Sequence, residues 1–128
     1  MMGDNVNHPK HYAGVPATVE CIDITRHLPF ALGNAVKYIW RAGKKGGPEQ
    51  EIEDLEKAQW YLDDWDCWRE HLPEVDFSAA LSVLHTIPSD DMGPLRWDVI
   101  DFILHEDIWN ARDTIDDWIS EVKRRQSK

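Results

Sequence analysis

Apolar residues recur along most of this chain at steps of three and four, which is the spacing of an amphipathic helix. A first helix is expected after Pro16, with Thr18 as its N-terminal cap, and Pro29 ends the pattern. A second helix is expected over residues 30–42, followed by Gly43 as its C-terminal cap. Its apolar face is formed by Leu32, Ala35, Val36 and Ile39.

A long third helix is expected from Pro48 to about His71, because proline suits the first helical position and Pro73 stops the helix. Its apolar positions follow a heptad-like seam made of Ile52, Leu55, Gln59, Leu62 and Trp65. The seam and the seven tryptophans of the chain together predict a homo-oligomer.

The remaining residues also favour helices. Residues 77–87 predict a short helix and residues 88–94 a turn-rich link. The apolar pattern of residues 97–108 predicts a further helix, which continues or restarts through residues 111–122. The basic tail, residues 123–128, is expected to fray.

These elements predict an all-α fold, a small helical domain with a long central helix and a helical C-terminal extension. Residues 1–16 are expected to form an irregular arm, because two X-Pro steps favour extended backbone there. Residues 17–73 form the helical core with the candidate site. Residues 74–128 form the extension, which we expect to pack on the same core.

Composition restricts the class of protein. The chain has 128 residues and is 42% hydrophobic, enough for one domain with a real core. Cys21 and Cys67 lie far apart and outside any CxxC, which fits a reducing cytosol. No apolar run approaches the roughly 20 residues of a membrane span, and no secretory signal is visible. We therefore expect a cytoplasmic protein with no membrane partner.

The net charge of −10 is unevenly distributed, since residues 1–46 carry six basic and three acidic side chains. A protein this acidic repels duplex DNA, which is not an expected partner. A patch of a few cations is enough for a mononucleotide, so a nucleotide is the expected small partner.

The basic patch lies at the end of the second expected helix, where residues 37–47 hold four basic side chains and three glycines. Steps of three, four and three residues place four polar side chains on one face: Asn34, Lys37, Arg41 and Lys44. Lys45 adds a further cation. Converging N–H donors of this kind bind phosphate, although a solvated helix end has the same composition. The segment is not a Walker A loop, because GxxxxGK[ST] is absent.

Aromatic and imidazole side chains offer further contacts. Tyr38 and Trp40 lie within the basic segment and can stack on a nucleobase or simply pack. His8 and His11 are three residues apart in the arm, where they can act as acid–base groups or pin the arm by hydrogen bonds.

An acidic run follows the basic segment. The carboxylates of Glu49, Glu53 and Glu56 share a helix face, with Asp63 and Asp64 further on, and could hold Mg²⁺. The alternative is that these acids complement the positive end of the helix dipole, and that alternative is favoured on sequence alone. No metal ligand is therefore assigned.

Four blocks, residues 6–12, 20–23, 32–46 and 54–62, resemble the bacteriophage domain of unknown function 3310 family, whose members are often labelled nucleotide kinases. The resemblance covers about residues 5–65. It implies phosphoryl transfer to a deoxynucleoside monophosphate without a Walker motif, with ATP or another nucleotide as donor, in the cytoplasm of an infected host cell.

Residue roles carried over by position complete this expectation. The catalytic residues would be Lys37, Arg41, His8 and His11. The substrate would be bound by Asn34, Tyr38, Lys44, Lys45 and Trp40. The cations would supply part of the charge neutralisation that Mg²⁺ usually provides.

Two alternatives stay open. The chain has a looser similarity to the all-α, MazG-like nucleotide pyrophosphohydrolases, which hold Mg²⁺ between Glu-rich helices. Here Asp63 and Asp64 lie on the same helix as the Glu run rather than on a second one. The second alternative is a non-enzymatic acidic protein that binds nucleotides or a host protein.

Overall fold

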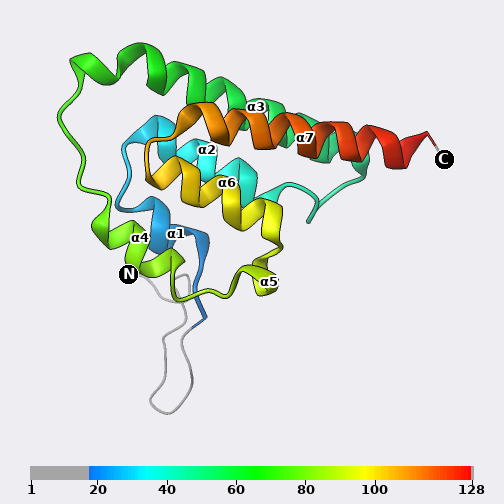
Figure 1. The fold of residues 1–128 in the computed structure, drawn as a ribbon, viewed down its shortest axis with the longest axis horizontal. Coiled ribbons are helices and arrows are strands. Elements are labelled where there is room, and N and C mark those ends of the chain that lie inside the picture. The colour runs from blue at the N-terminus through cyan, green and yellow to red at the C-terminus, as the bar shows by residue number, and fades with distance from the viewer. Residues whose placement is uncertain (1–17, 128) are drawn as a thin grey trace, which may run out of the picture.

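The computed structural model describes residues 18–127, which contain helices and no strand (Figure 1). The predicted all-α fold is confirmed. The helices are α1 (Cys21–Thr25), α2 (Phe30–Arg41), α3 (Pro48–Trp68), α4 (Ser78–Leu84), α5 (Ser89–Met92), α6 (Pro94–Leu104) and α7 (Ile108–Gln126), with a 3₁₀ turn, η1 (Arg69–His71), after α3. The arm with His8 and His11 lies outside the described residues. Within 18–127 no helix has both the length and the apolar character needed to cross a membrane.

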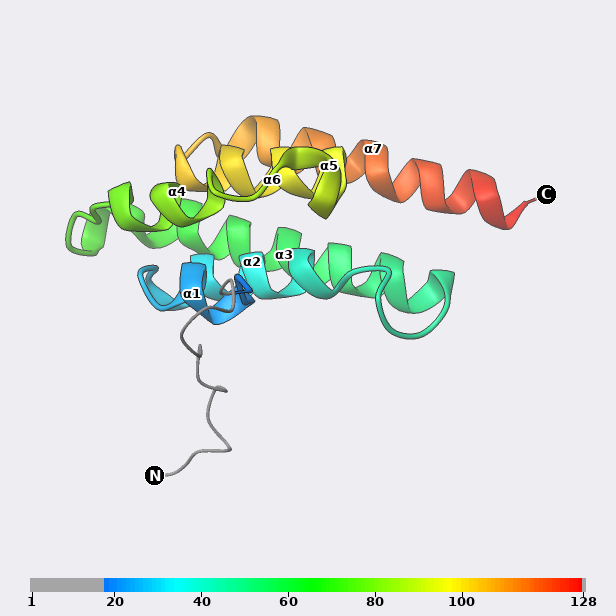
Figure 2. The ribbon, with the colours of Figure 1, turned by 90° about the horizontal axis from the view of Figure 1, so that it is seen from below.

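The helices form two layers that share one core. Figure 2 shows α1, α2 and α3 in one layer and α4 to α7 in the other. Helix α3 packs on α2 within its layer and on α7 across the layers, while α6 packs on both α2 and α7. Buried side chains from both layers belong to a single hydrophobic cluster, so residues 74–127 are part of the core that residues 18–73 use.

The first helix is shorter than expected. It begins at Cys21, and Glu20 rather than Thr18 is its N-cap. The backbone N–H of Glu20 donates to the Asp23 carboxylate at 2.8 Å, and the Glu20 side chain accepts from the backbone of Asp23. This reciprocal capping box satisfies two backbone donors, which a single threonine hydroxyl cannot do.

Several predicted boundaries agree with the structure. Pro48 occupies the first turn of α3, and α3 with its 3₁₀ turn ends at His71. The last long helix restarts, because Glu106 has a φ of 56° and the Asp107 side chain then accepts from the backbone of Asn110. The basic tail differs from expectation, since α7 continues through Gln126.

The heptad-like seam of α3 is occupied by the chain itself. Leu55, Leu62 and Trp65 are buried in the core that α3 forms with α2 and α7. The seam is therefore mostly covered by the chain itself, with Ile52 and Gln59 half-buried. Self-association stays a prediction, and it would have to use side chains that remain exposed, such as Trp60, Trp68 and Trp109.

Candidate functional site

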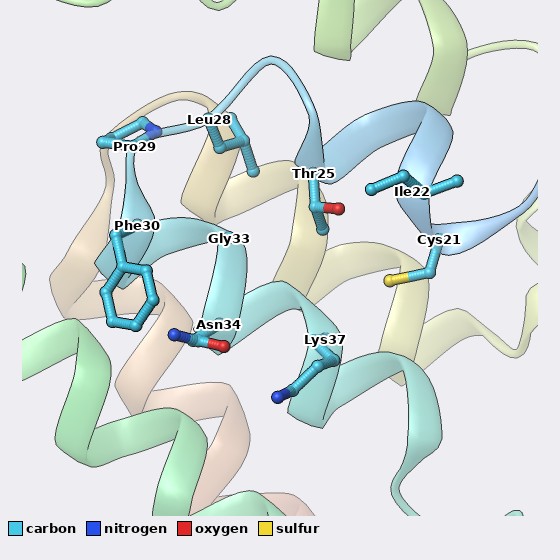
Figure 3. A pocket seen from close by; sticks show the side chains of 9 residues that line it. All are labelled: Cys21, Ile22, Thr25, Leu28, Pro29, Phe30, Gly33, Asn34 and Lys37. Carbon is cyan, nitrogen blue, oxygen red and sulfur yellow. The ribbon is translucent and has the colours of Figure 1, made fainter. Parts of the chain in front are cut away.

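A hollow of about 440 Å³ lies between α1, α2 and the link that joins them (Figure 3). Its polar lining includes Asn34 and Lys37 from α2 and Cys21 and Thr25 from α1. The apolar lining comes from Ile22, Leu28, Pro29 and Phe30. The structure thus brings two of the predicted site residues, Asn34 and Lys37, into one concave surface.

Helical spacing explains why Asn34 and Lys37 share this surface, because residues three apart lie on neighbouring turns of one face. Figure 3 shows the Asn34 amide between the Phe30 ring and the Lys37 ammonium, with the Cys21 sulfur on the other side of the hollow. The Phe30 side chain is 79% exposed. The hollow therefore presents a cation, an amide and an open aromatic ring together.

Two cations of α2, Lys37 and Arg41, and one of α3, Lys57, gather around Tyr38. The Tyr38 ring stacks on that of Tyr61, with ring centroids 6.0 Å apart. The distances to the Tyr38 ring centroid are 4.5 Å for Lys37 Nζ, 5.8 Å for Arg41 Cζ and 5.5 Å for Lys57 Nζ. The negative face of an aromatic ring attracts cations, so Tyr38 concentrates positive charge beside the hollow. Tyr38 is half-buried among these neighbours, and its contact with a substrate stays a prediction.

Lys57 is a member of this cluster that sequence reasoning missed as a site residue. Its ammonium pairs with Glu53 at 3.0 Å, and that hydrogen bond raises the pKa of Lys57. The i,i+4 pair with Glu53 is visible in the sequence, but the approach to Tyr38 depends on how α3 packs on α2.

Arg41 has a second role that the sequence did not reveal. Its Nε lies 3.6 Å from the carboxylate of Asp54, a side chain with only 1% exposure. The other carboxylate oxygen accepts from Gln50 Nε2 at 3.1 Å. A buried carboxylate requires a partner, so Arg41 neutralises Asp54 and is only partly available to a ligand.

The other two cations of the basic segment, Lys44 and Lys45, do not line the hollow. Lys44 Nζ lies 5.3 Å from the Trp40 ring centroid, and burial, followed by the nearby Arg96, lowers the pKa of Lys44. Trp40 thus packs against a lysine instead of facing the hollow. Lys45 is exposed. Of the predicted polar stripe, Asn34 and Lys37 line the hollow, whereas Arg41 and Lys44 do not. Lys45 does not line it either.

Cys21 lines the hollow and is half-buried. Burial raises the pKa of the Cys21 thiol to about 11, although the positive charges of Lys44 and Lys37 act in the opposite direction.

Alkylation of the two cysteines tests this environment. At pH 8 we expect Cys21 to react with iodoacetamide several-fold more slowly than the exposed Cys67, because a thiol with a raised pKa supplies little thiolate. Mass spectrometry of Cys21→Ser and Cys67→Ser variants gives the two rates separately. Equal rates would contradict the described burial of Cys21.

The carboxylates of the acidic run do not act as one group: some form ion pairs with separate basic residues, and others are exposed. Glu53 pairs with Lys57, and Asp63 pairs with Arg112 at 3.2 Å. Glu49 and Glu56 are exposed, and Asp64 is half-buried. Among residues 18–127 no three His, Cys, Asp or Glu side chains stand together in a way that would hold a metal ion.

Comparison with known proteins bears on the first half of the chain. Residues 6–63 match the family model of DUF3310. DUF3310 is described as a protein of unknown function. The DUF3310 segment includes α1, α2 and most of α3, and therefore the whole hollow, the Tyr38 cluster and the Arg41–Asp54 pair. No curated protein and no solved structure matched the chain.

Proposed function

We propose that this chain binds a mononucleotide in the α1–α2 hollow. The observation that carries the proposal is the convergence of Lys37, Asn34 and the open ring of Phe30 on one concave surface. Lys37 would receive the phosphate, and Phe30 would stack on the base. Asn34, which can both donate and accept, would bind the sugar or the edge of the base.

The size and charge of the hollow support this ligand. A volume of about 440 Å³ falls in the range of roughly 300–1,000 Å³ that is usual for small-molecule sites. The protein as a whole is strongly acidic, so an anion is attracted only where cations are concentrated. Lys37, Arg41 and Lys57 around Tyr38 provide such a concentration next to the hollow.

We further propose that the reaction is phosphoryl transfer from a nucleoside triphosphate to a deoxynucleoside monophosphate. The support for this step is the resemblance of the sequence to phage nucleotide kinase-like proteins. It is compatible with the site because phosphoryl transfer needs mainly positioning and charge neutralisation, which lysine and arginine side chains supply.

Two measurements test these statements separately. Calorimetric titration with deoxynucleoside monophosphates, the matching nucleosides and inorganic phosphate tests binding. We expect the monophosphates to bind more tightly than the nucleosides or inorganic phosphate do.

Transfer of a labelled γ-phosphate, with and without excess EDTA, tests the reaction. Hydrolysis that requires metal would favour the pyrophosphohydrolase alternative, and binding without turnover would favour a nucleotide-sequestering protein.

Lys37→Met should weaken binding of a deoxynucleoside monophosphate by about tenfold, because a charge-assisted hydrogen bond to phosphate is lost. Affinity for the matching nucleoside should change little. Lys123→Met, which removes the same charge from the far end of α7, is the matched control. Equal affinities of the Lys37→Met variant and the unmodified protein would remove Lys37 from the site.

A further inference from the structure

Three aromatic side chains form a contiguous patch on the surface of α2 and α3. The rings of Phe30 and Tyr61 meet edge to face with centroids 6.2 Å apart, and those of Trp60 and Tyr61 do so at 5.1 Å. Phe30 is 79% exposed and Trp60 is 62% exposed. Exposed rings that touch one another and are rimmed by charged residues are typical of an interaction site, whereas scattered single ones need no explanation.

The direction of Trp60 follows from its two neighbours in α3, a helix that packs on α2 with one side and on α7 with another. The Gln59 amide points to α7, where it donates to Asp116 at 2.7 Å. The Tyr61 ring points to α2, where it stacks on Tyr38. Because consecutive residues are about 100° apart around a helix, Trp60 lies in the middle of the exposed surface between α2 and α7.

One edge of the patch is cationic and lies toward α2. Its members are the three cations that surround the Tyr38 ring: Lys37, Arg41 and Lys57. Two carboxylates lie on the same side, but each already has a partner, since Glu53 pairs with Lys57 and the buried Asp54 pairs with Arg41. This edge therefore presents positive charge to a neighbouring molecule.

The other edge is acidic and lies toward α7. It consists of exposed carboxylates on both helices: Glu56 and Asp63 of α3, and Asp113 and Asp116 of α7. Glu56 precedes Gln59 by three residues and so shares its side of α3. Arg112 lies among these acids and pairs with Asp63 at 3.2 Å. With more carboxylates than cations, this edge presents negative charge.

We propose that this patch, made of Phe30, Trp60 and Tyr61 with its two charged edges, binds a second copy of the chain. In a two-fold dimer one surface meets itself, so the surface must be complementary to itself. A two-fold axis parallel to α3 places the cationic edge of each copy against the acidic edge of the other. The two Trp60 rings then lie at the centre, and Lys57 of one copy faces Glu56 of the other.

Other occupants fit this surface less well. A nucleic-acid strand would be attracted by the cationic edge and repelled by the acidic one. A uniformly basic or uniformly acidic protein would likewise be complementary to one edge and repelled by the other. A surface that carries both signs, on opposite sides of an apolar centre, matches a copy of itself.

The proposed interface borders the hollow, because Phe30 belongs to the patch and also lines the hollow. A second copy would therefore lie beside the candidate nucleotide site. The dimer follows from the exposed rings and the charged edges alone, so it does not depend on the function proposed above. It can be tested without any ligand.

Sedimentation velocity of the full chain tests the central contact. We expect dimers at about 100 μM, since a few exposed rings per copy are typical of a small interface. Trp60→Gln should weaken dimerisation at least about tenfold, because aromatic residues at the centre of an interface carry much of its free energy. Phe30→Ser, which removes the other exposed ring, should also weaken it.

Trp109→Gln is the matched control, because it removes a tryptophan that is 73% exposed on α7, outside the patch. It should leave the dimer unchanged. Circular dichroism confirms that each variant is folded. A monomeric unmodified chain would overturn the proposal, and so would equal weakening by Trp60→Gln and Trp109→Gln.

Reversed charges test the pairing of the two edges. Lys57→Glu and Glu56→Lys change exposed side chains, and each should weaken the homodimer several-fold, because like charges then face each other. A mixture of the two variants should regain the dimer, since each variant supplies the charge that the other has lost. A mixture that associates no better than its components would overturn the proposed arrangement.

Discussion

A chain cut after residue 73 is expected to lose cooperative folding. The extension supplies at least as many buried core side chains as the DUF3310 segment, among them Leu84, Ile100, Ile103, Leu104, Ile115 and Trp118. Without them, one face of α3 and much of α2 are left in water. Helices as short as α1 and α2 are marginal when isolated, so packing must stabilise them.

The measurement is thermal unfolding by circular dichroism of residues 1–73 beside the full chain. We expect a broad, non-cooperative signal from the fragment and a sigmoidal transition from the full chain. Mixing the fragment with residues 74–128 should restore part of the transition, since both pieces of one core are then present. A cooperative transition from residues 1–73 alone would show that the DUF3310 segment is an independent domain.

Arg41→Met is expected to lower the free energy of unfolding by about 2 kcal/mol, because it leaves the buried Asp54 carboxylate without its cation. Loss of one partner from a fully buried ion pair costs more than this, but Arg41 is 44% exposed and water screens part of the effect. Urea unfolding monitored by tryptophan fluorescence gives the value.

Rescue by a second substitution identifies the cause. In Arg41→Met with Asp54→Leu the buried charge is absent, so most of the lost stability should return. Arg69→Met breaks the ion pairs of Arg69 with Glu106 and Asp66 near the opposite end of α3, and it is the control for loss of more exposed carboxylate partners. If Arg41→Met alone leaves stability unchanged, Arg41 is free of Asp54 and available to the ligand after all.

The fold was predictable from sequence because its helices carry strong local signals. Steps of three and four in residues 32–39 gave the buried face of α2, and Pro48 marked the start of α3. The start of the first helix was predicted less accurately, because the choice between Thr18 and Glu20 as N-cap depends on the position of the Asp23 side chain. The partner of the α3 seam was not predictable, because a heptad pattern does not say whether the facing helix belongs to the same chain.

The candidate site was predictable only for side chains whose positions follow from the spacing within a single helix. Asn34 and Lys37 share a face of α2 by spacing alone, and they line the hollow together. Asp54 and Arg96 escaped notice because each contacts α2 from another helix. Lys44 follows Gly43, where the chain leaves the helix, so extending the helical spacing beyond Arg41 misplaced its side chain.

The two-sided packing of α3 restricts how the chain can change in length. One side carries Asp54 and Tyr61 toward α2, and another carries Gln59 and Asp63 toward α7. One inserted residue rotates everything after it by about 100° around the helix axis. A single-codon insertion within α3 would therefore misalign both interfaces at once. Relatives should vary in length in the connecting segments, residues 43–47 and 72–77, and keep the length of α3 constant.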